Sequence, residues 1–192
     1  MNARTDTRER ILTRAESLLS RRGFNGFSYQ DIATALGIKN AAVHYHFPAK
    51  ADLGLALINN YRDLLRRGTE TFMKSGGSAT RQLEGYFHFT AHDQLGEGVC
   101  PIGATTADFG SLNDTMKEAL QELVTETVRW LTHVLEVGRK QGEFEFEGDP
   151  AHKALSLMAS VQGARQLARV LGRPGAVRET TEQVRIDLGM KK

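Results

Sequence analysis

"SYQDIATALGIKNAAVHYHFPAK", residues 28–50, is the stretch that decides the fold of this chain. Ser28 is suited to cap a helix that begins after it, and Asp31 three residues later completes an approximate capping box. The apolar residues that follow at helical spacing are Ile32, Ala33 and Leu36. Gly37 then ends the helix, because glycine readily adopts the positive φ of a tight turn.

A second short helix is predicted to contain Ala41, Ala42, Val43 and Tyr45. Asn40 is suited to cap it, and Pro48 ends it because proline disfavours helical geometry in the preceding residue. Ile38 and Val43 are the apolar residues that hold this helix against the first. Two helices crossed at a glycine turn form a helix-turn-helix, whose second helix presents its outer side to a DNA major groove.

The polar and small residues on the outer side of this motif are predicted to reach base edges or phosphates. These DNA-binding candidates are Ser28, Tyr29, Gln30, Lys39, Asn40, Ala41, Ala42, His44, Tyr45, His46 and Lys50. Ala41 and Ala42 permit close approach to the groove, and Lys50 is placed to bind a phosphate. His44 and His46 are not expected to share a metal ion, because residues two apart point to opposite sides of a helix.

Charge is distributed unevenly along the chain. Residues 1–50 hold eight Lys or Arg against four acidic residues, a net charge of +4, whereas the remaining 142 residues carry −2. A basic head on a mildly acidic body favours polyanion binding by the head, with chance clustering as the alternative. No apolar run approaches the roughly 20 residues of a membrane span, and the polar start "MNARTDTRER" is unlike a secretory signal. We therefore expect a cytoplasmic protein without a membrane segment.

The remainder of the chain also has a helical pattern, which predicts an all-α fold: a three-helix head followed by about six helices. Helices are expected over residues 7–22, 49–73, 80–95, 101–109, 113–141, 149–171 and 176–188. Asp149 and Pro150 are a typical acidic cap and first helical residue. The segment "GEFEFEG" at 142–148 is expected to be a turn rather than a strand.

Residues 10–53 resemble the three-helix DNA-binding head of the TetR/AcrR-type transcriptional regulators. The matching motifs are Gly23-Phe24, Phe27-Ser28, Asp31-Ile32-Ala33, Gly37-Ile38 and Phe47-Pro48-x-Lys50-x-x-Leu53. The chain departs from the family at His44, where the family usually has a tyrosine that contacts phosphate. A histidine can also donate to a phosphate, so the departure concerns the identity of that contact.

The resemblance implies a DNA-binding domain over residues 1–50 and a ligand-binding and dimerisation domain over 51–192. It implies a homodimer formed through residues 149–188, and two recognition helices that meet the half-sites of a pseudo-palindromic operator. The function so implied is repression relieved by a small-molecule effector, without a cofactor. Enzymatic activity is not expected, because the chain lacks a G-x-S-x-G motif and a phosphate-cradling glycine loop. The alternative is a helical ligand-binding or scaffold protein without DNA binding.

The effector-binding candidates are aromatic or chemically reactive residues of the second domain. They are Phe72, Phe87, His88, His92, Cys100, Phe109 and Trp130. Plain core packing is the alternative for most of them. His88 and His92 lie four residues apart, a spacing that permits metal binding, but no third ligand is evident and no metal site is predicted.

Cys100 raises a separate possibility. In "GVCPIG" it precedes a short helix, whose N–H groups favour a reactive thiolate. Some members of the resembled family with a similar stretch sense through such a cysteine, so an oxidant or electrophile is the alternative effector. Against this, Asp93, Glu97 and Asp108 are negative neighbours in the sequence, and unpaired cysteines are commonly buried as small hydrophobic residues.

Overall fold

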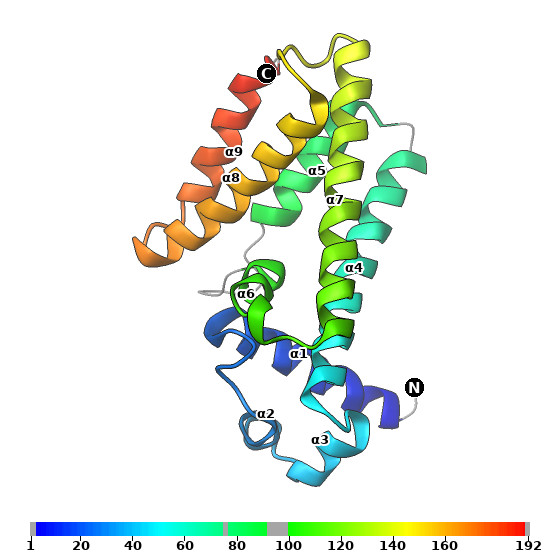
Figure 1. Ribbon diagram of the computed structural model, residues 1–192, viewed down its shortest axis with the longest axis vertical. Helices are drawn as coiled ribbons and strands as arrows, with labels where there is room; N and C mark the ends of the chain where they lie inside the picture. Colours follow the sequence, from blue (N-terminus) through cyan, green and yellow to red (C-terminus); the bar gives the residue numbers. More distant parts are fainter. Residues whose placement is uncertain (1–2, 75–76, 92–99, 191–192) are drawn as a thin grey trace. The chain divides into compact units, whose positions relative to one another are not determined.

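The computed structural model describes residues 3–74, 77–91 and 100–190, and this part of the chain is helical without strands, as predicted (Figure 1). Its α-helices are α1 (Ala3–Arg22), α2 (Tyr29–Leu36), α3 (Asn40–His46), α4 (Lys50–Lys74), α5 (Ala79–Ala91), α6 (Pro101–Ala107), α7 (Asp114–Lys140), α8 (Pro150–Val170) and α9 (Ala176–Asp187). A single 3₁₀ turn in the same residues, η1, spans Phe109–Ser111. Residues 142–148 form turns and irregular backbone, as expected.

The chain packs as two compact units. The first comprises Met1–Asp63 and Leu95–Gln121, and the second comprises Leu64–Gln94 and Glu122–Lys192. The first unit thus contains the three helices of the predicted head together with α6, η1 and the beginnings of α4 and α7. The functional boundary that we place between residues 50 and 51 stays a prediction.

In the first unit, α1 buries one face against α2 and α6. This face is formed by apolar residues at helical spacing, namely Ile11, Ala15, Leu18 and Leu19. On α4, Gly54 permits close packing, because a Cβ there would clash with Met116 Cε and would lie 2.8 Å from Phe24 Cε2. The beginning of α4 therefore lies directly against α7 and the residues that follow α1.

The second unit has its own core, to which α5, α7, α8 and α9 contribute. Its fully buried members include Leu83, Phe87, Leu131, Leu135, Ala154, Val161 and Leu188. Arg185 of α9 donates to both carboxylate oxygens of Glu84 on α5, at 2.6 and 2.7 Å. At the start of α8, Asp149 accepts from the Ala151 N–H at 2.8 Å and Pro150 is the first helical residue, as predicted. Among the described residues, no helix is both long and apolar enough to cross a membrane.

Candidate nucleic-acid interface

Both ends of α2 are fixed by its own residues. The Ser28 N–H donates to Asp31 Oδ2 at 2.8 Å and the Asp31 N–H donates to Ser28 Oγ at 3.3 Å, which is the capping box expected from the sequence. Hydrogen bonds from the Ser28 hydroxyl and then from its N–H hold the pKa of Asp31 below its ordinary value. At the other end, Gly37 has φ 66° and its N–H donates to Ala33 and Thr34 carbonyls. The turn into α3 is therefore defined locally, as predicted.

The inner side of α3 packs against α2. Ile32, Ala33 and Val43 are fully buried where these helices meet. Asn40 is the first residue of α3, Lys39 holds the cap position, and the Lys39 side chain makes no capping hydrogen bond within the described structure. The cap predicted at Asn40 is therefore wrong. The packing leaves the opposite side of α3 free to meet a ligand.

Most of the predicted DNA contacts lie on the surface. The exposed ones are Ser28, Gln30, Lys39, Asn40, Ala41, His44 and Tyr45, and the half-buried ones are Ala42, His46 and Lys50. Tyr45 is 65% exposed, so its ring contributes little to the core. We refer to Lys39, Asn40, Ala41, His44 and Tyr45, all exposed and within or beside α3, as the recognition edge.

Tyr29 does not share this exposure. Its side chain is buried, and its hydroxyl donates to the Phe47 carbonyl at 2.8 Å, which joins the start of α2 to the end of α3. Burial, followed by the charge of Asp52, raises the pKa of Tyr29 to about 12, so the hydroxyl stays a neutral donor. This corrects the role predicted for the Tyr29 side chain, which supports the helix pair from inside.

His44 is exposed but positioned by neighbours. Its ring lies edge-on to the Tyr29 ring, with centroids 4.7 Å apart, and its Nδ1 lies 3.4 Å from the Pro48 carbonyl oxygen. The imidazole is thus oriented from two sides at the surface end of α3. A phosphate contact from His44 is consistent with this placement and stays a prediction.

Lys50 is half-buried at the start of α4. Its ammonium donates to the Phe27 carbonyl and lies 4.8 Å from the centroid of the Phe24 ring and 4.5 Å from that of Phe27. Burial lowers the pKa of Lys50, while the nearby charges of Asp108 and Asp31 act in the opposite direction. An ammonium has three donors, so the bond to Phe27 uses only part of its capacity. Lys50 braces the turn after α1, and its phosphate contact stays a prediction.

The carboxylate of Asp108, the residue directly after α6, holds the turn between α1 and α2, and the sequence did not predict this role. Asp108 Oδ2 accepts from the Phe24 N–H at 2.7 Å and the Asn25 N–H at 3.3 Å, and Oδ1 accepts from Asn25 Nδ2 at 3.0 Å. Gly23 has φ 78°, and a Cβ there would lie 2.9 Å from Asp108 Oδ2. We call this arrangement the Asp108 clamp. Phe24 and Asn25 lie 84 and 83 residues before Asp108 in the chain, and no local sequence pattern indicates such a pairing.

The effector candidates are distributed over both units. Phe87 is fully buried in the core of the second unit, His88 is exposed and Phe109 is half-buried in η1. Trp130 packs against Tyr86 with ring centroids 5.9 Å apart, and its Nε1 is buried without a hydrogen-bond partner among the described residues. The Phe72 side chain and His92 lie outside the described residues. In the part that is described, no group of three metal-ligating side chains is found.

Cys100 lies at the cap position of α6, directly before Pro101. The helix begins where the sequence predicts and ends at Ala107, slightly earlier than expected. The thiol is 1% exposed, and its Sγ lies 3.4 Å from the Tyr61 hydroxyl. The cysteine is therefore part of the packed first unit.

Comparison of this chain with known proteins identifies its family. A family model described as "Tetracyclin repressor-like, C-terminal domain" matches residues 80–184, and one described as "Bacterial regulatory proteins, tetR family" matches residues 11–57. The chain belongs to the TetR family. As a TetR-family member it is a helix-turn-helix transcriptional regulator, which confirms the family and the fold inferred from the sequence.

Relatives of this TetR-family chain match along most of its length. The HTH-type transcriptional repressor DhaR of Mycobacterium sp. (strain GP1) is 26% identical over 163 residues, 84% of this chain and 82% of DhaR. The crystal structure of a TetR-family regulator from Agrobacterium tumefaciens has a TM-score of 0.89 at 29% identity and covers 96% of this chain and 98% of that one. A TetR regulator from Legionella pneumophila has a TM-score of 0.82 at 29% identity, with coverage of 95% and 97%.

Proposed function

We propose that this TetR-family regulator is a homodimeric cytoplasmic repressor that binds pseudo-palindromic operator DNA and is released by a small-molecule effector bound within residues 51–192. The observation that carries the proposal is the recognition edge, because α3 is anchored on one side and exposes polar groups on the other. DhaR, a relative along most of the chain, is named a repressor, which supports repression over activation. The regulator itself performs no catalysis in this scheme.

The recognition edge has the chemistry for reading a major groove. An asparagine such as Asn40 pairs with adenine through two hydrogen bonds, a lysine such as Lys39 donates to guanine, and an alanine such as Ala41 contacts a thymine methyl group. Each well-placed bidentate contact discriminates against a wrong base by about 1–3 kcal/mol. Ser28 and His44 are then the flanking contacts to phosphate, which position the protein without reading sequence.

An exposed apolar face in the second unit supports the dimer. Five of the seven large hydrophobic residues that are exposed in the described chain fall within residues 149–188, namely Leu155, Leu167, Val170, Leu171 and Ile186. Between the first two lie Ala159 and Gly163, both exposed, and a Cβ on Gly163 would meet nothing within 4 Å. Small residues in this position let a second helix approach closely. Exposed large apolar side chains concentrated in one part of a chain are typical of an interaction site.

Release requires that the effector prefer a dimer whose heads no longer match the two half-sites. A differential affinity of about 3 kcal/mol between the two states weakens DNA binding roughly a hundredfold. The alternative effector is an oxidant or electrophile acting at Cys100. The observation that favours it is the position of Cys100 on α6, the helix whose other end carries Asp108, because enlarging a buried thiol beside Tyr61 would displace α6. A Cys100→Ser variant that still responds to the effector would exclude this alternative.

Binding to the DNA upstream of the regulator's own gene tests the main proposal. An electrophoretic shift measured at several salt concentrations should show affinity that falls steeply as salt rises. A variant with Asn40→Ala and Tyr45→Ala should lose at least about tenfold in affinity, corresponding to one bidentate contact, whereas Thr125→Ala, exposed in the second unit, serves as control. Equal binding by both variants would contradict the assignment of the recognition edge. Light scattering of a Leu167→Glu variant, expected to be monomeric, tests the dimer separately.

A further inference from the structure

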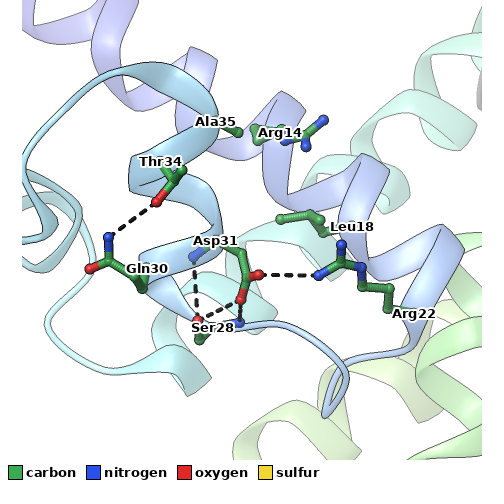
Figure 2. A pocket seen from close by; sticks show the side chains of 8 residues that line it. All are labelled: Arg14, Leu18, Arg22, Ser28, Gln30, Asp31, Thr34 and Ala35. Atoms are coloured by element: carbon green, nitrogen blue, oxygen red, sulfur yellow. Dashed lines mark hydrogen bonds and ion pairs between the residues drawn. The ribbon is translucent and has the colours of Figure 1, made fainter.

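A hollow of about 390 Å³ lies on the flank of the helix-turn-helix, between α1 and α2 (Figure 2). Its lining residues are Arg14, Leu18 and Arg22 from α1 and Ser28, Gln30, Asp31, Thr34 and Ala35 from α2 and its cap. We call it the α1–α2 hollow. Its volume lies in the range of small-molecule pockets, which are mainly apolar, whereas six of its eight lining residues have charged or hydrogen-bonding side chains. The lining therefore favours a compact polar ligand.

Most polar groups of the hollow are engaged with one another, and Arg14 is the exception. Figure 2 shows Asp31 bonded to Ser28 and to Arg22, the latter at 3.1 Å, and the Gln30 amide donating to the Thr34 hydroxyl. Arg14 has no hydrogen bond or ion pair to any described residue, and its Nε is buried without an acceptor. A buried N–H without an acceptor is costly, and a guanidinium has five donors. Arg14 therefore leaves the hollow with an unsatisfied cationic donor, which suits an anionic ligand.

The position of the hollow identifies which anion reaches it. In a helix-turn-helix the second helix enters the major groove while the first crosses the DNA backbone. Here α2 is that first helix, and its flank with Gln30 and Thr34 forms one wall of the hollow. We propose that the α1–α2 hollow seats one backbone phosphate of the operator in each subunit, with Arg14 as its principal ligand and Arg22 as the second.

The inference rests on the proposed function, because it requires DNA to lie along α3. Charge supports it: two arginines and one aspartate give the hollow a net charge of +1, which matches a single phosphodiester. The planar guanidinium fork fits phosphate oxygens and forms charge-assisted hydrogen bonds that are shorter and stronger than neutral ones. Asp31 does not repel the phosphate as a free carboxylate would, because Arg22 and Ser28 already bind it.

The test compares Arg14→Gln with Arg21→Gln. Arg21 is exposed on the same helix and outside the hollow, so the control removes the same charge from α1. Fluorescence anisotropy should be measured on the upstream DNA and on an unrelated duplex of equal length, at 50 and 200 mM salt. Arg14→Gln should weaken binding to both duplexes by the same factor, because a phosphate contact carries no sequence information. Loss of one phosphate contact per subunit lowers the slope of log affinity against log salt concentration by about 2 per dimer. The ratio of wild-type to Arg14→Gln affinity should therefore shrink about tenfold between 50 and 200 mM salt.

Other outcomes overturn the inference in distinct ways. Equal effects of Arg14→Gln and Arg21→Gln would show that only overall charge matters. A loss confined to the upstream DNA would make Arg14 a base-reading residue. If inorganic phosphate protects the wild type but not Arg14→Gln from thermal unfolding while DNA binding is unchanged, the hollow binds free anions instead. Failure of the wild type itself to bind DNA would refute the proposed function, a separate result.

A second variant separates loss of the phosphate contact from loss of the fold. Arg14→Lys keeps the charge but not the planar fork, so it should restore the salt slope while recovering only part of the affinity. If Arg14→Lys instead binds no better than Arg14→Gln, with both folded by circular dichroism, the phosphate seat is refuted.

Discussion

Removing the Asp108 carboxylate should loosen the turn between α1 and α2. Of the three hydrogen bonds that it accepts, the one from the Phe24 N–H is partly buried, and the two from Asn25 are exposed. A buried donor left without an acceptor costs about 1–3 kcal/mol, whereas water largely replaces the exposed bonds. Asp108→Ala should therefore lower the free energy of unfolding by about 2 kcal/mol. Asp108→Asn keeps one carbonyl oxygen for Phe24 and should lose about half as much.

Urea titration followed by circular dichroism measures this change, at one protein concentration because dimerisation contributes to stability. Glu147→Gln is the matched control, since Glu147 is exposed and makes no hydrogen bond or ion pair in the described structure. The m-values should stay equal, so that a shifted midpoint reports stability alone. If Asp108→Ala and Glu147→Gln unfold within about 0.5 kcal/mol of each other, the range of an ordinary surface substitution, the clamp does not hold the turn.

Three further predictions concern the elements around the site. Gly37→Ala should cost about 1 kcal/mol in the same titration because φ is 66° there, whereas Gly110→Ala, in open space and without a positive φ, should be neutral. Ser28→Ala removes the cap of α2 and should cost about 1 kcal/mol; an unchanged midpoint would contradict the capping role. Burial opposes the charge of Glu143, but hydrogen bonds from Thr80 and Ala79 outweigh it and lower its pKa. The hydrogen-bonded carboxylate of Glu143 therefore stabilises the fold at pH values above the ordinary pKa of glutamate, and this stabilisation is lost as the pH falls through the lowered pKa of the folded state. Glu143→Gln should accordingly reduce the decrease in the free energy of unfolding toward acid pH, measured by urea titration at successive pH values.

The sequence predicts α2 closely because the residues that define it are neighbours. Ser28 and Asp31 form a box three residues wide, and Gly37 supplies the turn without help from the rest of the fold. The same holds for Asp149 and Pro150 at the start of α8. Where a helix lacks a strong cap, as at Asn40, the prediction placed the cap one residue away. Helix boundaries that are fixed by local hydrogen bonds can therefore be predicted from the sequence.

Long-range partners explain what the sequence did not predict. The sequence places Tyr29 and Lys50 among the DNA-binding candidates on the outer side of the motif. Both have an apolar body that packs inward and a polar tip, and each tip finds a backbone carbonyl, of Phe47 and Phe27 respectively. Asp108 is a further case, since its partners lie more than 80 residues earlier in the chain. Only the folded arrangement shows that these side chains are engaged.

The clamp also connects the packing of the first unit to the energetics of release. The helix α6 has Cys100 at one end and Asp108 at the other, and it packs directly against α1. Breaking the bonds to Phe24 and Asn25 costs about 2 kcal/mol on the estimate above. Hundredfold release of DNA requires about 3 kcal/mol of differential affinity. If the effector favours a state in which α6 has moved away from the α1–α2 turn, it must bind that state more tightly, and this difference in binding must also offset the cost of breaking the clamp. A variant without the clamp should therefore need less effector for release, provided that α6 moves during the response.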